Sequence, residues 1–99
     1  MNTLHRQGDV GFLKIEELPL KLKKKKDNVI VYGEVTGHAH RLIDGSIHKD
    51  DDGQMYLITK DTAHVVHEEH NTVKLEKGYW KILRQREYTS QDMTRLVID

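Results

Sequence analysis

Short runs of hydrophobic residues alternate with polar residues along most of this chain, with a period of two. Alternation over about four to eight residues predicts half-buried β-strands. The clearest examples are residues 10–15, 29–32, 55–59, 63–67, 72–75 and 79–86. Turn-forming residues separate several of them, at 44–45, 49–53 and 76–78. Strands that recur at intervals of roughly 8–12 residues favour an all-β fold, either a small single-domain β-barrel or a β-sandwich.

Several segments depart from this alternation. We expect residues 1–8 and the lysine-rich loop at 20–28 to be flexible, because neither has the pattern of a packed strand. Two glycines, Gly33 and Gly37, follow the strand predicted at 29–32 and indicate a bulge or a sharp bend. The segment 90–97 predicts a short C-terminal helical turn, with Ser90 as its cap.

Length and composition narrow the function classes. The 99 residues are enough for one domain. Sixteen Lys and Arg balance sixteen Asp and Glu, so the net charge of zero argues against a general nucleic-acid coat or a polybasic membrane protein. No apolar run approaches the roughly 20 residues of a membrane span. The first residues lack the apolar stretch of a signal peptide, so we expect a cytoplasmic location. The lack of cysteine excludes disulfides, thiolate metal sites and a cysteine nucleophile.

Histidine is the residue type that carries candidate chemistry. Six of the seven histidines lie between His38 and His70. His38 and His40 are two positions apart, so on a regular strand they project from the same face. A metal site needs three or four nitrogen or oxygen ligands that converge on one ion. The pattern predicts a divalent-metal site built from His38, His40, His67, His70 and Glu69.

The residue types do not choose among zinc, iron, manganese and nickel. Parity along the chain also leaves open which of His64, His67 and His70 faces inward, because Glu68 and Glu69 form a predicted corner. Two other interpretations remain: these histidines lie on the surface with no shared role, or they act without metal as general acid and base.

Two further groups of residues are candidates for binding. Arg41, Arg84 and Gln85 are predicted to line a pocket beside the histidines, where an arginine could hold an anion. The lysines of the 20–28 loop could instead meet a partner, at Lys23, Lys24, Lys25 and Lys26. Nucleic acid is one such partner, but the loop lacks the interleaved aromatic residues that stack on bases, and composition does not favour it. A charge run of this kind is more often a solvated loop.

The chain resembles small uncharacterised proteins of bacteria and phages, a similarity that spans most of its length and implies no activity. The segments that carry it are 6–10, 33–41, 67–70 and 85–88. The middle of the chain also resembles the cupin pattern, with Gly33, His38, His40, Asp44, His67 and Asn71 in the places of the motif residues. That resemblance implies a β-barrel with a metal held by His38, His40 and His67.

The overall plan is also similar to the chaperonin-10 barrel. The similarity consists of the strand opened by residues 8–10, a lysine-rich loop near 19–28, residues 33–35 and 41–45, and the C-terminal segment. It implies a barrel only, because the loop lacks the hydrophobic tripeptide with which such loops engage their partner.

These features predict a small β protein whose histidines bind a divalent metal, either as a structural site or in support of a hydrolytic or oxygen-dependent reaction. The alternative is a metal-free interaction module, binding protein or RNA through the lysine-rich loop or an exposed strand edge, with a homo-oligomer as one form. Neither the reaction nor the assignment as an enzyme follows from the sequence.

Overall fold

The computed structural model describes residues 3–33 and 37–84, and all regular structure in these residues is β-strand. The prediction of an all-β fold is therefore confirmed. The helical turn predicted at 90–97 lies outside the described residues. The ten strands are β1 (Leu4–Gln7), β2 (Val10–Ile15), β3 (Lys23–Lys24), β4 (Val29–Tyr32), β5 (Ala39–Ile43), β6 (Ser46–Lys49), β7 (Met55–Thr59), β8 (Ala63–Val66), β9 (Val73–Leu75) and β10 (Gly78–Arg84).

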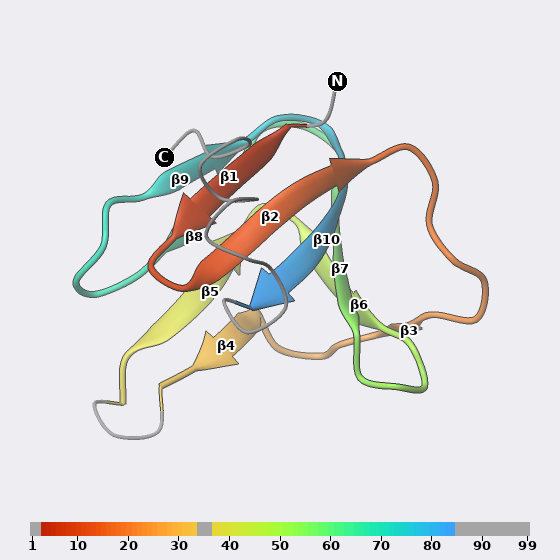
Figure 1. Cartoon of the computed structure of the whole chain (residues 1–99), viewed down its shortest axis with the longest axis horizontal. Helices are drawn as coiled ribbons and strands as arrows, with labels where there is room; N and C mark the ends of the chain where they lie inside the picture. The colour runs from red at the N-terminus through yellow and green to blue at the C-terminus, as the bar shows by residue number, and fades with distance from the viewer. Residues whose placement is uncertain (1–2, 34–36, 85–99) are drawn as a thin grey trace.

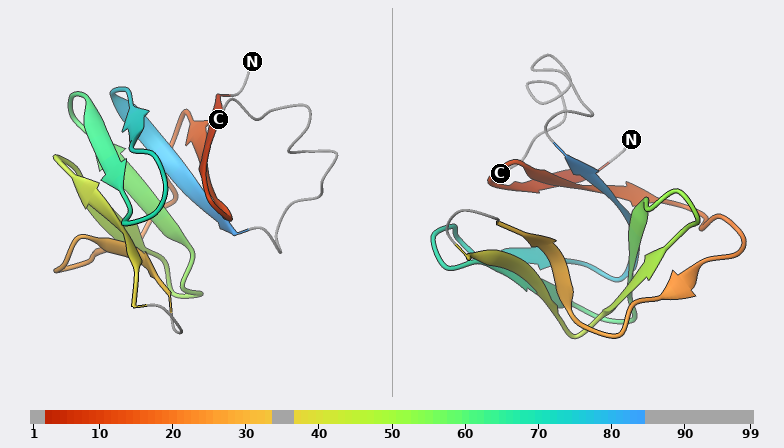
Figure 2. Two further views of the ribbon diagram at one scale, coloured as in Figure 1. Left: turned by 90° about the vertical axis from the view of Figure 1, so that its left-hand side faces the viewer. Right: turned by 90° about the horizontal axis from the view of Figure 1, so that it is seen from below.

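The strands form two antiparallel sheets that face each other (Figures 1 and 2). The larger sheet has the order β1-β2-β10-β7-β6-β3, and the smaller has the order β4-β5-β8-β9. Strand β1 at the edge of the larger sheet also contacts β9 at the edge of the smaller one. Within the described residues the sheets do not join into one closed hydrogen-bonded ring, which leaves the choice between a sandwich and a barrel open.

The core lies between the sheets, and alternation along the strands supplies it. On β10, Trp80 and Ile82 are buried, whereas Tyr79 is exposed on the opposite face. Phe12 on β2 and Leu57 on β7 are fully buried beside them. Full burial of an aromatic or aliphatic side chain contributes about 1.5–3 kcal/mol, so this inward row stabilises the packing of the two sheets.

The N-terminal segment forms a strand that the alternation pattern had not indicated. Strand β1 pairs with β2 through a two-residue turn at Gly8 and Asp9, with Gln7 opposite Val10. Gly8 has a φ of 63°, in the left-handed region that favours glycine, and such turns match the twist of paired strands. Leu4 and Gln7 are buried at the two ends of β1, which ties residues 4–7 to the domain.

The lysine-rich loop also contains a strand. Lys23 and Lys24 form β3, which pairs with β6 at the edge of the larger sheet. The bend predicted at the two glycines lies between β4 and β5, where the Gly33 N–H donates to the His38 carbonyl and the Gly37 N–H to the Gly33 carbonyl. This arrangement sets His38 just before β5 begins. No helix among residues 3–33 and 37–84 has the length and hydropathy that a membrane span requires.

Candidate functional site

Four of the predicted site residues meet at one end of the molecule. The ring centroids of His40 and His67 are 4.4 Å apart, and those of His67 and His70 are 4.6 Å apart. His38 lies 5.7 Å from His67, and His70 lies 6.1 Å from His40. Segments separated by about 30 residues therefore bring these four rings together, and we call them the histidine cluster.

The histidine cluster lies where the core-facing rows of several strands run out. Counting back from buried Leu42 on β5, every second residue is a histidine, first His40 and then His38. On β8, buried Ala63 and Val65 lead to His67, just past the end of the strand. The pleat thus points polar side chains into the space that the apolar core leaves at this end.

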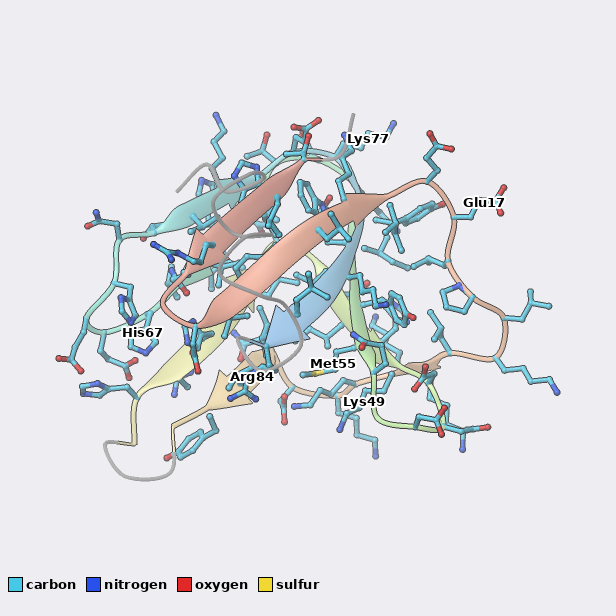
Figure 3. The ribbon with its side chains drawn as sticks, viewed as in Figure 1. Glu17, Lys49, Met55, His67, Lys77 and Arg84 are labelled. Atoms are coloured by element: carbon cyan, nitrogen blue, oxygen red, sulfur yellow. The ribbon has the colours of Figure 1, made fainter. Side chains whose placement is uncertain are left out.

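The larger sheet supplies the opposite wall in the same way. Its β10 row continues from Trp80 and Ile82 to Arg84, whose strand partner is Val10 on β2. The turn between β1 and β2 adds Asp9. In Figure 3, His67 and Arg84 lie in the same part of the view, away from Glu17.

A pocket of about 590 Å³ lies between these walls. Its lining is mostly polar, and the lining residues are Asp9, Val31, Tyr32, Gly33, His38, His40, His67, Glu69, His70 and Arg84.

His40 is the most constrained member of the histidine cluster. It is only 5% exposed, and its Nδ1 lies 2.7 Å from Oε1 of Gln7. The Gln7 amide nitrogen donates to the carbonyls of Val65 at 2.9 Å and Asn71 at 2.8 Å, which fixes the orientation of this amide. Its oxygen must then accept from His40, so Nδ1 carries the proton and Nε2 keeps a lone pair.

The charge state of His40 follows from its surroundings. Burial, and then the nearby His67, lower its pKa from 6.5 to about 4, and His70 and Arg84 act in the same direction. The Asp9 carboxylate opposes this shift without reversing it. His40 is therefore neutral near pH 7, which is the form in which imidazole binds a metal.

The loop after β8 places the other histidines. The Glu69 backbone N–H donates to Nδ1 of His67 at 3.0 Å, so neutral His67 has its proton on Nε2. A carboxylate oxygen of the same Glu69 lies 2.6 Å from Nδ1 of His38. Glu69 thus contacts two members of the histidine cluster, one through its backbone and one through its side chain.

Glu68 attaches this loop to β5. Its Oε1 accepts the Ala39 N–H at 3.0 Å, and its Oε2 lies 3.4 Å from Nη1 of Arg41. The Ala39 hydrogen bond is the largest of the causes that lower the pKa of Glu68 to about 2. Arg41 is therefore engaged beside the site and is not among the residues found to line the pocket.

His70 separates the main pocket from a smaller one. It is exposed, it stacks at 11° to His40, and it packs against Gly8. A Cβ added to Gly8 would lie 2.7 Å from Nε2 of His70, so a larger residue there would displace this ring from its present position. The second pocket, of about 330 Å³, lies beyond His70 and is lined by Arg6, Gln7, Gly8, His70, Asn71, Thr72 and Val73.

The structure thus places His38, His40, His67, His70, Glu69 and Arg84 around one pocket. Gln85 lies outside the described residues, and the lysines at 23–26 are absent from the lining of either pocket described above. Within residues 3–33 and 37–84, no three His, Asp or Glu side chains are already arranged to hold one metal ion. Gln7 and Asp9 were not predicted as site residues, although the Gly8-Asp9 pair before an alternating run is itself a hairpin signal.

The comparisons with known proteins identify a family. A family model described as "Domain of unknown function (DUF8820)" matches residues 6–85. The chain belongs to this family. The match confirms the resemblance to an uncharacterised protein family, and it spans every residue that lines the two pockets. No curated protein and no solved structure matched the chain, so the resemblances to cupins and to chaperonin-10 stay predictions.

Proposed function

We propose that the histidine cluster binds a divalent transition metal, either as a structural site or in support of a hydrolytic or oxygen-dependent reaction. The observation that carries the proposal is the convergence of four imidazole rings at centroid distances of 4.4–6.1 Å on one pocket. Nitrogen ligands without thiolates suit zinc, iron, manganese or nickel.

The contacts of two histidines support this proposal. A ligating histidine usually places its second ring nitrogen against a carboxylate or carbonyl, which fixes the tautomer. Gln7 does this for His40, and the Glu69 carboxylate is placed to do it for His38. Both rings would then bind through Nε2, with Glu69 orienting His38 instead of acting as a ligand itself.

The third ligand requires a local change. When His67 is neutral, its proton is on Nε2 and its Nδ1 accepts the Glu69 N–H. Binding a metal through Nε2 would require the proton to move to Nδ1. The hydrogen bond from the Glu69 N–H would then be broken. This coupling is a physical reason why the ligand set is not already assembled. A bound metal would require the His67–His70 loop to shift relative to β5, and a metal held by three histidines would supply an activated water at its remaining position.

The test is a metal analysis of untagged protein purified without chelator. The expected result is close to one metal ion per chain and a melting temperature that falls on adding EDTA. The double variant H38A/H40A should lose the metal. The matched control H48A/H64A removes two histidines that do not line the pocket and should keep it.

Two results would overturn the proposal. One is protein that carries no metal and shows no melting shift on addition of zinc, iron, manganese or nickel. The other is equal metal content in H38A/H40A and in the control, which would place the bound ion elsewhere.

A further inference from the structure

The pocket is much larger than a metal ion requires. A water molecule occupies about 30 Å³ of liquid volume, so an ion with two or three bound waters fills only a small part of the roughly 590 Å³ present. Sites for small molecules typically span about 300–1,000 Å³. The volume therefore accommodates an organic ligand next to the ion.

The lining indicates what such a ligand carries. Only Val31 and Gly33 among the lining residues lack a polar side chain, so the pocket does not favour an apolar molecule. Arg84 faces the histidine cluster from the other sheet, close enough to His40 that its charge helps to lower the pKa of that ring. A guanidinium presents its donors in a planar fork that matches a carboxylate or a phosphate.

The charges of the loaded pocket would attract an anion. Asp9 lies 3.9 Å from Nη2 of Arg84, so a carboxylate and a guanidinium face each other on this wall of the pocket. Asp9 and Arg84 balance each other, and Glu69 is engaged with His38. A divalent ion would then leave the interior net positive, and a partly enclosed site strengthens its attraction for an anion.

We infer that the metal-loaded pocket binds a small molecule through a carboxylate or phosphate group, with Arg84 contacting the oxyanion while the metal holds a second donor of the same molecule. This inference rests on the metal site of the proposed function. It assigns the substrate class of that site, and it gives Arg84 a binding role that metal coordination alone does not require.

The experiment uses the full chain loaded with cobalt(II), with excess metal removed by dialysis. Inorganic phosphate and succinate are titrated separately, and binding is followed by calorimetry and by the visible spectrum of the cobalt ion. The expected result is saturable binding of at least one of the two anions. R84Q should keep its cobalt and lose at least tenfold in anion affinity.

R41Q is the matched control, because Arg41 lies beside the site on β5 but is engaged by Glu68. Its anion affinity should stay within twofold of the parent chain. R84K separates charge from fork geometry: it should restore part of the phosphate affinity and less of the succinate affinity, because only the guanidinium binds a carboxylate bidentately.

Each outcome has one meaning. If the chain takes up no cobalt, the titrations are repeated by calorimetry with whichever of zinc, iron, manganese or nickel it binds; uptake of none of these overturns the metal site, and this inference with it. If cobalt binds but neither anion does, or if R84Q and R41Q weaken anion binding equally, the inference is wrong while the metal site stands. Binding of phosphate alone or of succinate alone identifies which oxyanion the pocket takes.

Discussion

Two regions of this protein gather titratable side chains, and they hold them in opposite ways. In the histidine cluster, His40 is 5% exposed and its orientation is fixed by Gln7. At the edge of the larger sheet, which we call the lysine edge, Lys23 and Lys24 are exposed and lie opposite Lys49 and His48 of β6.

The difference shows how burial specifies chemistry. A buried polar group must find a hydrogen-bond partner, because leaving it unpaired costs about 1–3 kcal/mol, so its position is determined by the fold. Exposed lysines are solvated in any rotamer. Like charges that face each other on neighbouring strands also destabilise the pairing of those strands. Lysines also protect a sheet edge from the addition of another strand. The histidine cluster is therefore positioned by the fold, whereas the lysines of the lysine edge are solvated, and their contact with a partner stays a prediction.

The largest expected effect comes from removing the residue that fixes His40. Gln7→Leu should lower stability by about 4 kcal/mol, because it leaves the His40 N–H and the carbonyls of Val65 and Asn71 without their partner. It should also weaken metal binding about 10–100-fold. Urea unfolding and metal titration measure the two effects.

Gln54 provides the control for this change. Its amide also donates to two backbone carbonyls, those of Met55 and Ile82, but no hydrogen bond with a histidine is found for it in the described residues. Gln54→Leu should cost stability while leaving metal affinity unchanged. A metal affinity that falls equally in both variants would show that Gln7 acts only through overall stability.

The next effect is the pH dependence of the metal-free protein. The pKa of His40 falls from 6.5 to about 4 on folding, so between these values the unfolded chain binds more protons. Stability is therefore fully present above pH 6.5 and is lost as the pH falls toward 4, by at most about 3 kcal/mol. His40→Gln should flatten this part of the profile. Unfolding in EDTA across this range is the measurement, and an unchanged slope in the variant would assign the dependence to other groups.

A smaller effect separates backbone strain from the position of His70. Gly8→Ala and Gly53→Ala each place a side chain at positive φ, at 63° and 86°, which costs about 1–2 kcal/mol. Only the Gly8 variant also meets a neighbour, Nε2 of His70 at 2.7 Å, whereas nothing lies near the added Cβ at Gly53.

Both variants should therefore lose similar stability, but only Gly8→Ala should shift the imidazole resonances of His70 and alter metal affinity. NMR spectra and metal titration test this pair. Identical spectra for His70 in the two variants would mean that the ring does not depend on Gly8.

The two regions also show which parts of the structure can be predicted from the sequence. Alternation predicted the strands that supply the core, and extending the inward rows of β5 and β8 leads directly to His40 and His67. The corner predicted at Glu68 and Glu69 prevented this assignment, because the alternation of inward and outward side chains cannot be extended through a turn. His70 in particular reaches the pocket only through that turn. The role of Gln7 could not be predicted from alternation for another reason. Its side chain has three hydrogen-bond partners that are far from it in sequence, and only the packing of the two sheets brings them together.

The smallest expected effect is at the lysine edge. Lys24→Gln should change stability by less than about 0.5 kcal/mol, because the side chain is exposed. Burial is the main cause that lowers the pKa of His48, and the Lys24 charge adds to it. The variant should therefore raise the pKa of His48 only part of the way to its ordinary value, as followed by NMR titration.

High salt should give the parent chain most of the same rise, because the Debye length shortens to about 3 Å at 1 M. Lys26→Gln is the control, and a His48 shift of equal size there would show that the loop acts through its total charge instead of through the Lys24 and His48 pairing.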